Sequence, residues 1–239
     1  MKLIFIRHAE PDYSIDSLTE KGWKEAELLA KRTAKWDVKD FYCSPLGRAK
    51  DTASFTLKHF GREAKIYDWL QEFYYRVEDP YTGKERVGWD FYPRYFTKER
   101  LMYDPDKWVE SPIYKNSDMP AKYEEVKSGL DKILLEHGYR RNGRFYSVEQ
   151  GNEDTLVFFC HLGVQFVMLS HLLGIPAPLL WQGVFVAPSS VTILSTEERV
   201  KGEAYFRLKC IGDTSHLYVA DEPPSDSGFF METYHEGGK

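Results

Sequence analysis

The stretch KLIFIRHAE, residues 2–10, decides the fold. Its first five residues form a short apolar run that does not alternate with polar residues and stops at Arg7 and His8. This pattern is typical of a strand buried on both faces of a parallel sheet. A second run of the same kind, TLVFFC at 155–160, stops at His161. The sequence therefore predicts two buried strands that each deliver polar side chains at the carboxyl end.

Helical segments follow these strands, so that strand and helix alternate along the chain. Thr19 can cap the first helix, and Pro45 ends a second strand because it lacks a backbone donor. The predicted strands are 2–6, 40–45 and 155–160, and the predicted helices are 23–36, 46–60 and 164–174. Further β-rich runs lie between 184 and 211. Such repeated units predict an α/β fold, a three-layer α/β/α sandwich with a mainly parallel central sheet, whose ligands bind beyond the carboxyl ends of the strands.

Two stretches fall outside this alternation. Residues 73–119 hold twelve of the 37 aromatic residues, a composition unlike that of a disordered linker, and predict an ordered aromatic-rich inserted subdomain that serves as a cap or lid. The tail, 221–239, is rich in proline, serine and glycine, and we expect it to be partly disordered. The remainder of 1–220 is expected to form a single domain.

Composition and charge exclude several classes of protein. Lys plus Arg minus Asp plus Glu is 32 − 37, a net charge of −5, which disfavours nucleic acid as a partner. No apolar run approaches the roughly 18 to 20 residues of a membrane span, and the opening residues are too polar for a secretory signal, so we expect the mature chain to start at Met1. Cys43, Cys160 and Cys210 show neither disulfide nor zinc-ligand spacing. A cytoplasmic protein without membrane contacts fits best.

The ends of the predicted strands carry a distinctive set of side chains. Arg7 and His8 follow the first strand, Arg48 lies one turn into the second helix, Glu72 follows a short third strand, and His161 follows the strand at 155–160. Arginine matches phosphate oxygens with a planar fork of donors. A neutral imidazole is a competent nucleophile near pH 7, and a carboxyl group can protonate a poor leaving group. The set predicts phosphoryl transfer through a phosphohistidine.

The order of the motifs resembles the histidine phosphatase superfamily, in its phosphoglycerate-mutase-like branch. The motifs are RHAE at 7–10, LTEKG at 18–22, SPLGRAKDTA at 44–53, LQE at 70–72, FCHLG at 159–163 and GDTSHL at 212–217. The resemblance implies that His8 is the phosphorylated nucleophile, that Glu72 is the proton donor, and that Arg7, Arg48 and His161 bind the phosphate. His161 also counts among the expected catalytic residues. Ser14, where many members have Asn, is a further expected phosphate ligand, and no metal or cofactor is implied.

Several positions depart from the family pattern. Ala9 replaces a glycine, Pro11 replaces a serine or threonine, and Leu162 replaces the glycine after the second histidine. The run FYYRVEDPYTG at 73–83 lacks the R-x-Y-G-x-L-x-G-x-N pattern of a true mutase. The absence of this run favours a phosphatase over a mutase.

The sequence thus predicts a metal-independent phosphatase that hydrolyses a small-molecule phosphate monoester. A mutase is one alternative, with the carboxylate of its substrate bound by one of four arginines: Arg94, Arg100, Arg140 or Arg141. A non-catalytic phospho-ligand binder and a protein-docking role for the insertion are the others. Glu78 and Asp79 compete with Glu72 as proton donor, and His171 is expected in the core. The substrate and the oligomeric state stay open, with a homodimer as one option.

Overall fold

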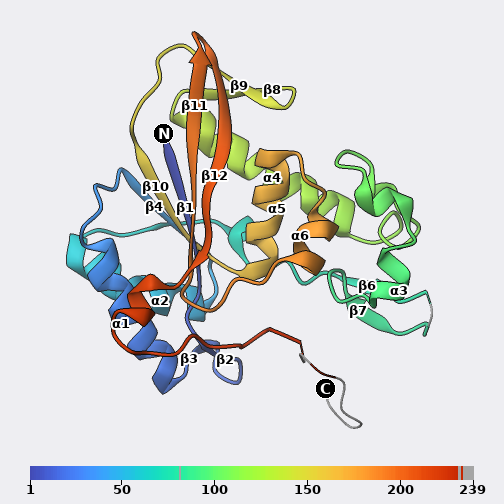
Figure 1. Ribbon diagram of the computed structural model, residues 1–239, viewed down its shortest axis with the longest axis horizontal. Coiled ribbons are helices and arrows are strands. Elements are labelled where there is room, and N and C mark those ends of the chain that lie inside the picture. Colours follow the sequence, from blue (N-terminus) through green and yellow to red (C-terminus); the bar gives the residue numbers. More distant parts are fainter. Residues whose placement is uncertain (81, 231–232, 234–239) are drawn as a thin grey trace.

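The computed structural model describes residues 1–80, 82–230 and 233 (Figure 1). The strands are β1 (Lys2–Arg7), β2 (Pro11–Asp12), β3 (Ser17–Leu18), β4 (Asp40–Cys43), β5 (Lys65–Ile66), β6 (Arg76–Glu78), β7 (Glu85–Val87), β8 (Tyr139–Asn142), β9 (Phe145–Val148), β10 (Thr155–Cys160), β11 (Val191–Val200) and β12 (Glu203–Asp213). The helices are α1 (Glu20–Thr33), α2 (Gly47–Phe60), α3 (Pro93–Phe96), α4 (Met119–Glu136), α5 (Leu162–Leu173), α6 (Ala177–Gly183) and α7 (Ser215–Tyr218), with the 3₁₀ turns η1 (Asp68–Leu70), η2 (Arg100–Tyr103) and η3 (Trp108–Glu110).

One large sheet forms the centre of the molecule, in the order β5-β4-β10-β1-β11-β12-β9-β8. The strands β5, β4, β10 and β1 are parallel neighbours, and the β1 to β10 register pairs Arg7 with Cys160. The pairs from β1 through β11, β12 and β9 to β8 are antiparallel. Of the described strands of this sheet, β11 and β9 therefore run against β1. The predicted α/β fold with a central sheet between helical layers is confirmed.

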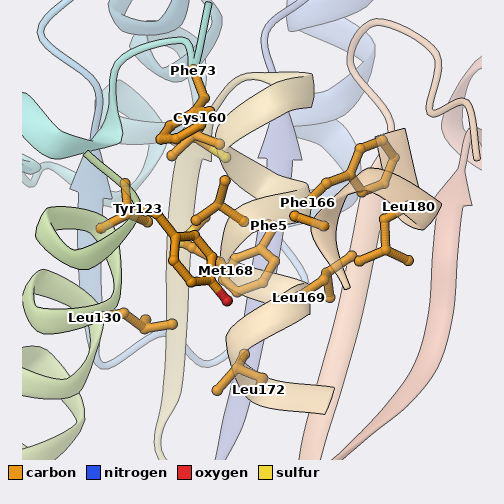
Figure 2. Packing of buried hydrophobic residues seen from close by; sticks show 14 of the residues in the cluster. Phe5, Phe73, Tyr123, Leu130, Cys160, Phe166, Met168, Leu169, Leu172 and Leu180 are labelled. Carbon is orange, nitrogen blue, oxygen red and sulfur yellow. The ribbon is translucent and has the colours of Figure 1, made fainter. Parts of the chain in front are cut away.

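Helices cover both faces of the sheet because its central strands are buried on both sides. Side chains of β1 alternate: Leu3 and Phe5 join a core with α4, α5 and α6, whereas Ile4 and Ile6 join a core with α1 and α2. Figure 2 shows the first of these cores, in which Phe5 lies among residues of α4, α5 and α6. This two-sided burial is why the strands read as unbroken apolar runs.

The helix boundaries follow their capping signals. The hydroxyl of Thr19 accepts a hydrogen bond from the N–H of Gly22 at 3.0 Å, so that α1 begins at Glu20, three residues earlier than predicted. The helix α5 ends at Leu173, and Gly174 caps it in a left-handed conformation with φ 67°. The β-rich residues 184–187 are not a strand, and their backbone serves the site described below.

The inserted residues 73–119 contain the β6–β7 hairpin, α3, η2 and η3, and Figure 1 shows the hairpin and α3 beyond α6. Trp108 of this segment is fully buried and packs edge-to-face on Trp181 of α6, with ring centroids 5.3 Å apart. The segment therefore shares its core with the main fold. Its action as a cap or lid stays a prediction.

The expected disorder of the tail falls partly on 231–232 and 234–239, which lie outside the described residues. Residues 221–230 are described and cross below the sheet (Figure 1). Glu222 anchors this stretch, because its carboxylate pairs with Lys21 at 2.6 Å and with Lys24 at 2.5 Å. Within the described ranges, no helix has the length and apolar character needed to span a membrane.

Candidate active site

Two histidines meet where the central parallel strands end. His8 directly follows β1 and His161 directly follows β10, and the N–H of His8 donates to the carbonyl of Cys160 at 2.9 Å. The two imidazole centroids lie 5.0 Å apart, and both rings are almost completely buried. The parallel register thus places the two histidines predicted from the strand ends side by side.

A backbone contact fixes the tautomer of His8. Its Nδ1 lies 2.8 Å from the carbonyl oxygen of Ala9, and because a carbonyl only accepts, Nδ1 carries the proton. Burial lowers the pKa of His8 well below its usual value, and the charges of Arg7 and Arg48 lower it further. The ring is therefore neutral near pH 7, with its lone pair on Nε2.

Only one ring nitrogen of His161 has a hydrogen-bond partner among the described residues. Its Nε2 lies 2.7 Å from the hydroxyl of Ser44, whereas its buried Nδ1 has no hydrogen-bond partner within the described part of the chain. Burial lowers the pKa of His161 well below its usual value, with further lowering by His8, Arg48 and Arg7. A neutral ring whose Nε2 accepts from Ser44 presents Nδ1–H as a donor for an oxygen of a ligand.

The two predicted arginines line the same cavity. Arg7 donates to the carbonyl of Val186 through Nη1 and to that of Ser227 through Nη2, both at 2.7 Å. Arg48 pairs with Asp16 at 2.5 Å, and Asp16 also accepts from the N–H of Gly47. The Nε atoms of both guanidinium groups are buried without a partner among the described residues. Donors in this state are suited to oxygen atoms of a dianion.

Glu72 faces the arginines from the loop after η1. Its Oε1 accepts from the backbone N–H groups of Phe73, Gly163 and Val164 at 2.7, 2.9 and 3.3 Å. Burial raises the pKa of Glu72, against the lowering effect of the Phe73 N–H and of Arg7. Since Oε1 is occupied by donors, a proton on the neutral acid resides on Oε2. Burial thus favours the protonated form of the Glu72 carboxyl group.

Arg7, Arg48 and Glu72 open into a cavity of about 300 Å³, whereas the buried rings of His8 and His161 are not among its lining residues. Arg7, Arg48 and Glu72 form its charged end, and Gly228 of the tail closes one side. The remaining lining residues were not among the expected site residues: Tyr13, Tyr74, Trp89 and Leu162. The aromatic excess of 73–119 was a signal for Tyr74 and Trp89, whereas no sequence signal marked Tyr13 or Gly228.

The structure brings together five of the six expected site residues. The sixth, Ser14, is exposed and gives its hydroxyl to Asp12 at 2.5 Å. The rival donors are also elsewhere, since Glu78 is exposed and Asp79 pairs with Arg86 at 2.6 Å. The roles assigned to these residues, including that of Ser14, stay predictions.

Sequence reasoning missed two supporting residues, Ser44 and Asp16. Ser44 belongs to the quoted motif at 44–53, so the sequence already indicated that it lies at the end of a strand. Asp16 lies in a loop with φ 49°, and its contact with Arg48 depends on that loop's conformation. Across the described ranges, no group of three or more His, Cys, Asp or Glu side chains is arranged to hold a metal ion.

Comparison with known proteins places this arrangement in a family. The family model for the histidine phosphatase superfamily (branch 1) matches residues 3–205. The chain therefore belongs to the histidine phosphatase superfamily.

Individual relatives match the chain only at low sequence identity or over a short part of its length. A 2,3-bisphosphoglycerate-dependent phosphoglycerate mutase of Thermoplasma acidophilum is 37% identical over 70 residues, 25% of this chain and 35% of that protein. Phosphoserine phosphatase 1 of Hydrogenobacter thermophilus is 24% identical over 83% of this chain and 88% of its own length. A crystal structure of a phosphoserine phosphatase from Entamoeba histolytica superposes with a TM-score of 0.59 at 18% identity, covering 90% of this chain and 98% of that one, and shows the shared fold. Family membership and the two relatives named as phosphatases support a phosphatase.

Proposed function

We propose that the protein hydrolyses a small-molecule phosphate monoester through a phosphohistidine on His8, without a metal ion. The observation that carries the proposal is the hydrogen bond from Nδ1 of His8 to the carbonyl of Ala9, which leaves the lone pair on Nε2. This neutral nucleophile lies beside His161, and the charges of Arg7 and Arg48 act on it. The same two arginines line one cavity with Glu72.

In the first step Nε2 of His8 attacks phosphorus, and the bond from phosphorus to the ester oxygen breaks. Arg7, Arg48 and Nδ1–H of His161 stabilise the charge on the phosphoryl oxygens. Oε2 of Glu72 gives its proton to the leaving alkoxide, so that a neutral alcohol departs. The raised pKa of Glu72 supports this role because the group must be protonated before the step.

In the second step the carboxylate of Glu72 takes a proton from water, and the water oxygen attacks phosphorus. The bond between phosphorus and Nε2 breaks, which releases inorganic phosphate and restores the neutral imidazole and protonated Glu72. The pair of arginines supplies the charge neutralisation that a metal ion supplies in other phosphoryl-transfer sites.

The four arginines considered as carboxylate ligands of a mutase lie outside the cavity. A mutase needs a cation for the carboxylate of its substrate, and none of Arg94, Arg100, Arg140 and Arg141 lines the cavity of Glu72. Arg140 and Arg141 belong to β8, at the end of the sheet farthest from β5. The positions of these four arginines therefore favour hydrolysis over transfer to a phosphoglycerate.

Release of phosphate from a panel of phosphate monoesters tests the proposal, with the His8→Ala variant as the blank. We expect turnover by the wild-type protein, none by His8→Ala, and no change on addition of EDTA. A phospho-ligand binder would instead bind phosphate tightly without turnover. Loss of turnover in EDTA that a divalent ion restores would contradict the metal-independent mechanism.

A further inference from the structure

A second cavity, of about 150 Å³, adjoins the one that holds the charged groups. The two cavities share Trp89, Leu162 and Gly228 as lining residues, so they are neighbouring compartments of one site. We call the second cavity the aromatic slot. Its apolar lining side chains include Trp89, Leu162, Trp181, Phe185, Phe229 and Phe230.

Charge is confined to the first cavity. Arg7, Arg48 and Glu72 are the only charged residues lining either cavity within the described chain. With Glu72 protonated, Arg7 and Arg48 are the cations that these two linings offer to a phosphate dianion, and Arg48 is already paired with Asp16. A carboxylate elsewhere on the substrate would then enter the slot without a cation to pair with, which is unfavourable in an apolar enclosure.

Three side-chain donors of the slot's walls are bonded within the protein. The indole N–H of Trp89 donates to the carbonyl of Phe73 at 2.8 Å, and that of Trp181 donates to Gly163 at 3.1 Å. The amide of Gln182 donates to the carbonyl of Trp89 at 2.6 Å. The two indole N–H groups are therefore unavailable to a carboxylate on a ligand, and the aromatic side chains of the slot offer ring faces and edges instead.

The tail completes the slot. Phe229 packs edge-to-face on Phe185 with centroids 5.0 Å apart, and the preceding Ser227 accepts the hydrogen bond from Arg7. Gly228 lies so close to Arg7 that a Cβ there would be 2.7 Å from Nη2. The aromatic wall at 229 is thus held against the phosphate-binding end of the site.

On the basis of the proposed function, we propose that the natural substrate is a phosphate monoester with an aromatic or otherwise apolar alcohol, and not one that carries a carboxylate. The phosphate lies at Arg7 and Arg48, and the apolar group of the alcohol lies in the aromatic slot. Phe229 and Trp89 are the residues that determine this specificity.

Two alkyl esters test the substrate class, 2-phenylethyl phosphate and O-phosphoserine, because neither has a phenolate leaving group that departs without acid. We expect kcat/KM for the phenylethyl ester to be higher by about 10-fold or more, the scale that apolar pockets provide. The Phe229→Arg variant places a cation in the slot and should lower this ratio by about 10-fold. Tyr218→Arg, at a strongly exposed aromatic outside both cavities, is the matched control and should leave the ratio unchanged.

Equal or better turnover of O-phosphoserine by the wild-type protein would overturn the substrate class while leaving the His8 chemistry intact. An unchanged ratio in Phe229→Arg would likewise overturn it. If neither ester nor 4-nitrophenyl phosphate is hydrolysed in a His8-dependent manner, the proposed function itself fails, and the substrate class with it.

Discussion

The backbone N–H of Gly163 donates to Oε1 of Glu72 across 2.9 Å. This contact joins the loop after η1 to the first turn of α5, next to His161. Backbone N–H groups in the first turn of a helix have no partner within the helix, so a carboxyl oxygen satisfies them well. The arrangement fixes which oxygen of Glu72 accepts and leaves Oε2 for the proton.

An alanine at position 163 tests this contact. Its Cβ would lie 2.6 Å from Oε1, closer than a normal contact, so the carboxyl group must move. We expect Gly163→Ala to lower kcat for an alkyl phosphate by about 100-fold, the size of a general-acid contribution, and to lower that for an aryl phosphate less. Steady-state kinetics on both esters measures this, and circular dichroism checks that the variant is folded. Full activity toward the alkyl ester would show that this contact does not position the acid.

Replacement of Glu72 tests the proton donor by leaving-group chemistry. Glu72→Gln should slow an alkyl phosphate by about 100-fold or more, because its alkoxide cannot leave without a proton. An aryl phosphate should suffer less in this step, since a nitrophenolate leaves as the anion. Glu78→Gln is the matched control, because its exposed carboxylate lines neither cavity. Equal losses on both esters in Glu72→Gln, or the leaving-group dependence in Glu78→Gln, would show that the donor is assigned wrongly.

Much of this site could be predicted because parallel strands deliver their carboxyl ends to one edge. The unbroken apolar runs before His8 and His161 were enough to place both histidines there. Arg48 and Glu72 could be added because their motifs come in the family's order.

Other parts of the site depend on contacts between segments far apart in the chain. Arg7 bonds to the backbone of Ser227, 220 residues away, and no residue pattern encodes a bond to a carbonyl. Residues 184–187 have a β-rich composition, yet they form no strand, and the carbonyl of Val186 accepts a hydrogen bond from Arg7. The exposure of Ser14 follows in the same way from the conformation of its loop, which a single sequence does not reveal.

The raised pKa of Glu72 predicts an alkaline limb in the pH dependence. A general acid works only while protonated, so kcat/KM for an alkyl phosphate should fall as pH rises through this pKa, which lies above the ordinary value of 4.5. The acid limb from His8 should lie below pH 6.5, because burial lowers its pKa. Glu72→Gln should lose the alkaline limb and keep the acid limb. An alkaline limb that persists unchanged in Glu72→Gln would belong to another group.

The shared core of the insertion predicts a large effect on stability. Trp108 is fully buried against Tyr114, Tyr123 and Trp181, so Trp108→Ala should lower the free energy of unfolding by about 3–5 kcal/mol. Urea denaturation followed by circular dichroism measures this, with the more exposed Trp23 replaced by alanine as the control. A loss below 1 kcal/mol would indicate that the insertion does not stabilise the main fold.

Trapping of the covalent intermediate tests the central claim most directly. The wild-type protein is mixed with a ³²P-labelled phosphate monoester, quenched within milliseconds and digested for mass spectrometry. A phosphoryl group on nitrogen is labile in acid and stable in alkali, so we expect an alkali-stable, acid-labile label on the peptide that holds His8, and none in His8→Ala. A label on another residue, or undiminished hydrolysis by His8→Ala, would contradict the account.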